Sequence, residues 1–238
     1  MTEAPAPVLK VCGATAPQDI EVLAAAGADR VGLWHGVPGG PADLPERELT
    51  ALAAAARATG VLEPVLVTFL DDPDALAGAA RRAGVSRLQL HAYQPPAFVR
   101  ALRTALPDAV LIKVLHVRDG NCLERPLIGA YERAGTDLFL LDATAGDGRV
   151  GSTGLRLAES DVLALAERFT LPFWLAGGIT PHSRTDCAAV ADHPRFHGID
   201  VDTAARDGRG RFDAEAVTAL ARAWRTARHP VPYPKEHP

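Results

Sequence analysis

Cys12 and Lys10 together could supply a general base. Cys12 follows a short apolar stretch that begins at Val8, and Lys10 stands two residues earlier, so on an extended strand both side chains point to the same side. A cationic neighbour favours the thiolate over the thiol, and a thiolate can act as a general base. A cysteine on a buried strand can equally be a small core residue, so both interpretations of Cys12 stay open.

Asp142 is the corresponding candidate for a general acid. It follows the apolar run Leu138 to Leu141, where a carboxylate is poorly solvated unless it is paired. Poor solvation favours the protonated form, and a protonated carboxyl group can give its proton to a substrate. The alternative is a carboxylate that accepts hydrogen bonds from loop amides.

Two short turns are candidates for binding an anion. Gly177 and Gly178 precede an expected helix, so their backbone N–H groups can face a phosphate. Thr203 and Ala204 follow the last expected strand, where a barrel usually completes its phosphate site. A plain Gly-Gly turn without a ligand is the alternative.

Four further side chains lie at or just after the ends of expected strands. Trp34 and His35 could stack on a ligand or hydrogen-bond to it, although Trp34 could also pack the barrel against its helices. His91 and His116 could contact a substrate, although such histidines are often held in structural hydrogen bonds.

Composition limits the function classes. The 238 residues carry a formal net charge of -4 with no basic block, which argues against nucleic acid as the main partner. The three cysteines, Cys12, Cys122 and Cys187, form no CxxC pair and predict neither a disulfide framework nor a zinc site. We expect a cytoplasmic protein, because the N-terminus lacks signal-peptide features and no apolar run is long enough to span a membrane.

The elements that must position these residues alternate along the chain. We expect strands at 8–12, 30–34, 65–69, 87–91, 110–117, 138–142, 173–176 and 198–201, and helices at 16–26, 46–59, 71–84, 95–106, 123–134, 160–169, 181–191 and 214–227. Continuous apolar strands that alternate with helices are typical of a parallel sheet covered by helices. Eight such units favour a single (β/α)₈ barrel, placed at residues 1–228 and followed by a loosely ordered tail at 229–238.

Taken together, these segments resemble the phosphoribosylanthranilate isomerase family. The matches run in chain order and cover nearly the whole sequence: Lys10–Thr15 (family Lys-Ile-Cys-Gly-Ile-Thr), Gly27–Gly32, Leu88–His91, Ile112–Lys113, Leu140–Asp142 with Gly151–Gly154, Leu175–Pro181 and Gly198–Val201. The resemblance implies a (β/α)₈ TIM barrel of the ribulose-phosphate-binding type and a role in tryptophan biosynthesis.

The resemblance also implies a reaction. It is the Amadori rearrangement of N-(5'-phosphoribosyl)anthranilate, an aldose-to-ketose conversion that uses no metal and no cofactor. Asp142 would protonate the furanose ring oxygen, and Cys12 as thiolate would remove the C2' proton. The phosphate would lie on Gly177, Gly178, Thr203 and Ala204, and the other expected substrate-binding residues are Lys10, Trp34, His35, His91, Gly154 and Asp202. The only other partner expected is a second copy of the chain, in a homodimer, with a monomer as the alternative.

Several substrate-holding positions depart from the family pattern. The family carries an arginine in a Ser-x-Arg segment after the second strand, whereas this chain has no arginine there before Arg47. Asp202 places a negative charge near the expected phosphate, Ala204 replaces a glycine, and Leu155 replaces a lysine. Arg206 and Arg209 could offset the charge of Asp202.

These departures leave three hypotheses. The first is an isomerase acting on phosphoribosylanthranilate or a close analogue. The second is a barrel of the same type that acts on a different, non-phosphorylated or otherwise altered substrate in a specialised pathway. The third is a non-catalytic ligand-binding barrel, against which the presence of both Cys12 and Asp142 argues.

Overall fold

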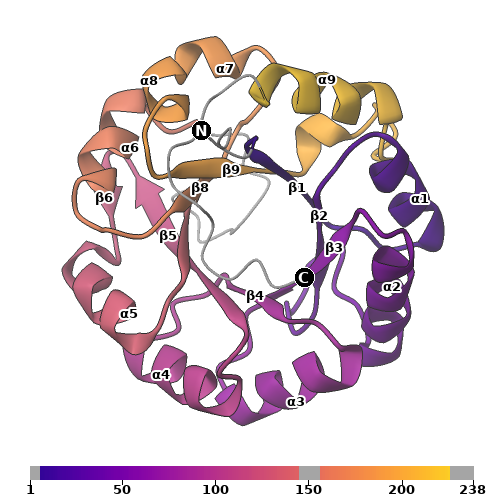
Figure 1. Ribbon diagram of the computed structural model, residues 1–238, viewed down its shortest axis with the longest axis horizontal. Coiled ribbons are helices and arrows are strands. Elements are labelled where there is room, and N and C mark those ends of the chain that lie inside the picture. Colours follow the sequence, from indigo (N-terminus) through magenta and orange to yellow (C-terminus); the bar gives the residue numbers. More distant parts are fainter. Residues whose placement is uncertain (1–5, 145–155, 226–238) are drawn as a thin grey trace, which may run out of the picture.

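Eight parallel strands close into a barrel in the computed structural model, which describes residues 6–144 and 156–225. The strand order is β4-β3-β2-β1-β9-β8-β7-β5, and pairing of β4 with β5 closes the barrel. Helices form an outer ring around these strands (Figure 1). The prediction of a (β/α)₈ barrel is therefore confirmed. The strands are β1 (Val8–Cys12), β2 (Arg30–Trp34), β3 (Glu63–Thr68), β4 (Arg87–Leu90), β5 (Val110–Arg118), β7 (Leu138–Ala143), β8 (Phe173–Leu175) and β9 (Phe196–Val201).

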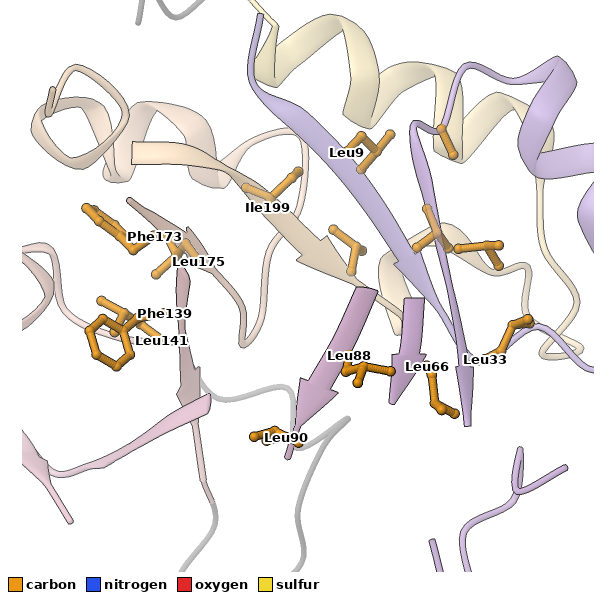
Figure 2. Packing of buried hydrophobic residues seen from close by; sticks show 14 of the residues in the cluster. Leu9, Leu33, Leu66, Leu88, Leu90, Phe139, Leu141, Phe173, Leu175 and Ile199 are labelled. Atoms are coloured by element: carbon orange, nitrogen blue, oxygen red, sulfur yellow. The ribbon is translucent and has the colours of Figure 1, made fainter. Parts of the chain in front are cut away.

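Alternation along each strand divides the core into two layers. Leucine, isoleucine and phenylalanine side chains pack between the sheet and the helices, as Figure 2 shows for Leu9, Leu88, Phe139 and Ile199. The alternate positions form a second cluster inside the barrel. This interior cluster comprises Cys12, Val65, Val67, Val110, Ile112, Val114, Leu138, Leu140, Trp174 and Ala176.

The helices follow the strands in the expected order. Glycines Gly84 and Gly135 end two of them in left-handed conformations that glycine adopts without strain. The helices are α1 (Pro17–Ala25), α2 (Glu46–Ala58), α3 (Pro73–Ala83), α4 (Pro96–Ala105), α5 (Ile128–Ala134), α6 (Glu159–Ala166), α7 (Ser183–Asp186), α8 (Ala188–Ala191) and α9 (Ala214–Trp224).

Two expected helices differ from the structure. Residues 123–134 are not one helix, because a short strand β6 (Asn121–Cys122) pairs antiparallel with the end of β5 and a 3₁₀ turn η1 (Arg125–Leu127) precedes α5. Pro126 inside η1 has no N–H to donate to a continuous helix. Residues 181–191 form two short helices, α7 and α8, because the backbone at Cys187 leaves the helical region with φ −117° and ψ 33°.

The turn from β1 to α1 also differs in its capping. The sequence Thr15-Ala16-Pro17 predicts the Thr15 hydroxyl as the N-cap of α1, but the N-cap is Ala16, which makes no side-chain cap. Asp19 closes this turn instead, because its carboxylate accepts hydrogen bonds from the backbone N–H groups of Thr15 and Ala16 at 2.8 and 3.0 Å.

Some expectations fall outside the described residues. Gly154 and the proposed tail at 229–238 belong to this part of the chain, so the structure describes neither of them. Across the described residues, no helix combines the length and the apolar character needed to cross a membrane.

Candidate functional site

A cavity of about 440 Å³ lies at the carboxyl ends of the strands. This is the end of a (β/α)₈ barrel where chemistry is usually found. Nine of the expected site residues line the cavity: Cys12, Trp34, His91, Asp142, Gly177, Gly178, Asp202, Thr203 and Ala204. Among the described residues, no group of three or more His, Cys, Asp or Glu side chains is arranged to hold a metal ion.

Lys10, Cys12 and Asp200 form a buried cluster between β1 and β9. Lys10 Nζ donates to Asp200 Oδ2 at 2.7 Å and to Cys12 Sγ at 2.8 Å, and Sγ lies 3.8 Å from Asp200 Oδ2. Lys10 and Asp200 are direct partners in the register of the two strands. Lys10 is fully buried beside the cavity wall, so it acts on Cys12 without lining the cavity itself.

Burial raises the pKa of the Cys12 thiol to about 12. The Asp200 carboxylate adds to this rise, and the Lys10 ammonium opposes it without overcoming it. Lys10 therefore lies where the sequence places it, but its charge is shared with Asp200. In the ligand-free protein Cys12 is a thiol whose proton points toward Asp200.

Asp142, at the end of β7, faces His91 across the cavity wall. Asp142 Oδ2 lies 3.4 Å from His91 Nε2, and both side chains are buried. Burial lowers the pKa of His91, with the Asp142 carboxyl opposing that shift. His91 is therefore a neutral imidazole at neutral pH, and its other ring nitrogen, Nδ1, contacts Gln89 Nε2 at 3.0 Å.

The turn after β8 has a left-handed backbone at two successive glycines. Gly177 and Gly178 have φ values of 84° and 58°, which residues with a side chain rarely adopt. Thr203 and Ala204 lie in a 3₁₀ turn, η2 (Thr203–Ala205), that directly follows β9. Both turns line the same cavity.

An arginine accompanies the unusual Asp202. Arg206 Nε donates to Asp202 Oδ1 at 2.6 Å, and Arg206 Nη2 donates to the backbone carbonyl of Gly13 at 2.9 Å. The arginine therefore neutralises Asp202 and ties the end of β9 to the end of β1. Arg209, the other arginine expected to offset Asp202, contributes a backbone hydrogen bond to Asp207 instead.

Trp34 and His35 have different surroundings. The Trp34 indole lines the cavity, and its buried Nε1 has no hydrogen-bond partner among the described residues. His35 does not line the cavity. Its Nδ1 contacts the carbonyl oxygen of Leu44 at 2.8 Å, and this contact joins the two ends of the loop after β2. His116 is fully buried against Glu124, with Nδ1 2.5 Å from Oε1, and also lies outside the cavity lining.

Three residues of the site were not predicted from the sequence. Asp200 and Gln89 lie on strands within runs assigned to the core, although Gln89 is two residues from His91 and therefore shares its face. Arg156 lines the cavity, and its Nη1 is 2.5 Å from Asp186 Oδ2 on α7. Arg156 is the only lysine or arginine among the described cavity-lining residues.

The fold and the cavity define the class: a (β/α)₈-barrel enzyme with its polar side chains gathered at the carboxyl ends of the strands. The sequence profile of the N-(5'-phosphoribosyl)anthranilate (PRA) isomerases matches residues 9–222. The chain belongs to this isomerase family, as its resemblance implied.

Relatives and solved structures agree with this assignment. A Methanosarcina mazei protein named N-(5'-phosphoribosyl)anthranilate isomerase 2 is 30% identical over 210 residues, which cover 88% of this chain and 90% of the relative. The Haloferax volcanii N-(5'-phosphoribosyl)anthranilate isomerase is 33% identical, with coverage of 94% and 95%. The crystal structure of the Thermotoga maritima phosphoribosyl anthranilate isomerase has a TM-score of 0.73 and 22% identity, covers 92% of this chain and 99% of its own, and supports the fold.

Proposed function

We propose that this protein catalyses the Amadori rearrangement of N-(5'-phosphoribosyl)anthranilate or a close analogue, with Asp142 as general acid and Cys12 as general base. The observation that carries the proposal is that a buried carboxyl group and a buried thiol line one cavity at the carboxyl ends of the strands. Family membership supports the same reaction class.

The first step is ring opening. The protonated Asp142 gives its proton to the furanose ring oxygen, the bond from that oxygen to C1' breaks, and the nitrogen lone pair forms a C1' iminium. The position of Asp142 favours this role because its carboxyl group lines the cavity at the end of β7, where it can meet a bound substrate.

The second step removes the C2' proton. The Cys12 thiol first gives its proton to Asp200, whose pKa is raised by burial and which is therefore a better acceptor than an exposed carboxylate. The thiolate, held by the Lys10 ammonium, then takes the C2' proton, and the electrons of that bond neutralise the iminium. The resulting enolamine tautomerises to the aminoketose.

The two ends of the substrate have separate binding groups in this proposal. The phosphate lies on the backbone N–H groups of Gly177, Gly178, Thr203 and Ala204, a cradle suited to an anion. Arg156 supplies a positive charge at the phosphate end of the substrate. It lies near the Gly177–Gly178 turn because its partner Asp186 is on α7, the helix that follows this turn. At the other end, the Trp34 indole, which lines the cavity, offers an aromatic face to the aglycone.

The test follows the loss of anthranilate-type fluorescence from phosphoribosylanthranilate made in situ. Native protein should turn the substrate over, and Cys12→Ser and Asp142→Asn should each lose about 100- to 10,000-fold in kcat, the usual contribution of one acid or base. Cys122→Ser is the matched control, because Cys122 lies outside the cavity lining and should keep native turnover. Absence of turnover by folded native protein contradicts the proposal for this substrate.

A second candidate function rests on Asp202 and on the missing loop arginine. A barrel with this charge next to the amide cradle could act on a substrate that lacks the phosphate or the carboxylate. The same assay separates the two candidates when the dephosphorylated riboside is compared with the phosphate ester. Faster turnover of the riboside favours the second candidate.

A further inference from the structure

The backbone of His91 is hydrogen-bonded on both sides, and an aromatic ring covers one face of its imidazole. Its backbone N–H donates to Thr68 O at 3.1 Å, and its carbonyl accepts from His116 Nε2 at 3.0 Å. The Phe69 ring stacks on the imidazole with centroids 5.6 Å apart and an interplanar angle of 26°. The ring edge that carries Nε2, which no described residue hydrogen-bonds, faces the Asp142 carboxyl group.

Gln89 decides which ring nitrogen carries the proton. Gln89 is fully buried on β4, and its Nε2 lies 3.0 Å from His91 Nδ1. An amide NH₂ group only donates hydrogen bonds, so Nδ1 must accept and cannot carry a proton. In a neutral imidazole the single proton then belongs to Nε2.

We propose that Gln89 is a positioning residue that keeps His91 in the Nε2–H tautomer, so that this N–H faces Asp142 Oδ2 at 3.4 Å. The inference rests on the proposed role of Asp142 as the acid. When Asp142 gives up its proton, the N–H of His91 stabilises the new carboxylate. In the opposite tautomer a nitrogen lone pair would face that carboxylate and repel it, so the acid would release its proton less readily.

The first test reads the tautomer and needs no substrate. Nitrogen-15 NMR of the imidazole groups at pH 8, with His91 assigned by a His91→Asn variant, distinguishes protonated from unprotonated ring nitrogens. Native protein should show Nε2–H at His91. Gln89→Met, of similar length but without an N–H, should lose this preference, and Gln89→Glu should reverse it, because a carboxylate accepts a hydrogen bond from Nδ1–H.

Gln94→Met is the matched control. Gln94 is another buried glutamine, and it donates to the backbone carbonyl of Leu70 rather than to a histidine. This variant should keep the Nε2–H tautomer of His91 even where it lowers stability. An Nδ1–H tautomer in the native protein, with the Gln89 carbonyl as its acceptor, overturns the proposal.

The second test is kinetic. Gln89→Glu, which reverses the tautomer, should lower kcat by about 10- to 100-fold, the usual effect of removing a hydrogen bond to a charged group, with KM little changed, and Gln89→Met should have a smaller effect because both tautomers are then populated. A reversed tautomer with native kcat overturns the catalytic part of the inference. Native protein that has the Nε2–H tautomer but does not turn over phosphoribosylanthranilate supports the assignment for Gln89 and contradicts the proposed function, so the two failures are distinguishable.

Discussion

Replacing Asp200 by asparagine should turn Cys12 from an unreactive thiol into a reactive one. The Asp200 carboxylate holds the Lys10 ammonium and at the same time disfavours a second negative charge on Cys12 Sγ, 3.8 Å away. With a pKa of about 12, only about one Cys12 side chain in 10,000 is a thiolate at pH 8. The neutral amide introduced by Asp200→Asn would leave Lys10 with the thiolate as its only anionic partner in the cluster.

The size of the effect follows from the separation of the two charges. Two unit charges 3.8 Å apart repel by roughly 4 kcal/mol at an effective dielectric constant of about 20. At about 1.36 kcal/mol for each pH unit, removing this repulsion lowers the pKa of the Cys12 thiol by about 3. The thiolate fraction at pH 8, and with it the rate of alkylation, should rise by about 1,000-fold.

The assay is alkylation by iodoacetamide, followed by mass spectrometry of the peptide that contains Cys12. Asp202→Asn is the matched control, because Asp202 is paired with Arg206 and is the weakest of the charges that act on Cys12. Adding Lys10→Met to Asp200→Asn should abolish the increase, since the ammonium is what stabilises the thiolate. The reasoning is refuted when Asp200→Asn reacts no faster than Asp202→Asn.

Two further predictions concern binding and stability. Arg156→Ala should raise KM for the phosphorylated substrate by about 10-fold or more without a matching loss of kcat. Asp186→Ala, which frees the same arginine, should not raise KM, and steady-state kinetics on both variants checks this. Lys113 is buried, and its pKa is lowered to about 8, so the unfolded chain binds more protons than the folded one between pH 8 and its ordinary value of 10.5. The contribution of Lys113 to stability therefore rises with pH, by about 2 kcal/mol from about pH 7.5 to about pH 9.5. Urea unfolding should show this rise in native protein relative to Lys113→Met, and parallel pH profiles of the two proteins would contradict it.

The fold could be predicted because its signals are local. Most of each strand is apolar, and each helix has a proline, aspartate or glycine near its boundary that fixes where the backbone turns. The predictions were wrong where one short stretch of sequence is compatible with two local structures. Thr15 is a suitable N-cap by type, but Asp19 provides the capping bonds, and the segment from Leu123 has helical composition but contains Pro126.

Only part of the candidate site could be predicted. The end of a strand can be recognised from neighbouring residues in the sequence, whereas a charge pair between two distant strands cannot. Cys12 and Asp142 each follow an apolar strand, so the barrel topology alone brings both to one cavity. Asp200 stands inside the apolar sequence Ile199-Asp200-Val201, and its importance depends on the pairing of β1 with β9 across 190 residues of chain. A closed barrel implies that the first and last strands pair, but the sequence does not show their register or which cation the carboxylate meets.

Charge pairing also explains how this site tolerates its departures from the family pattern. Among the residues that the structure describes, three carboxyl groups line the cavity, and they would repel a phosphate if all three were unpaired. Asp200 is held by Lys10 and Asp202 by Arg206, and Asp142 faces His91. The carboxylates of Asp200 and Asp202 are therefore balanced within the protein, and Arg156, which is paired with Asp186, also lines the cavity. Because Arg206 balances the charge of Asp202, the presence of Asp202 is compatible with an anionic substrate. Asp202 and Arg206 together leave the net charge beside a bound phosphate nearly unchanged.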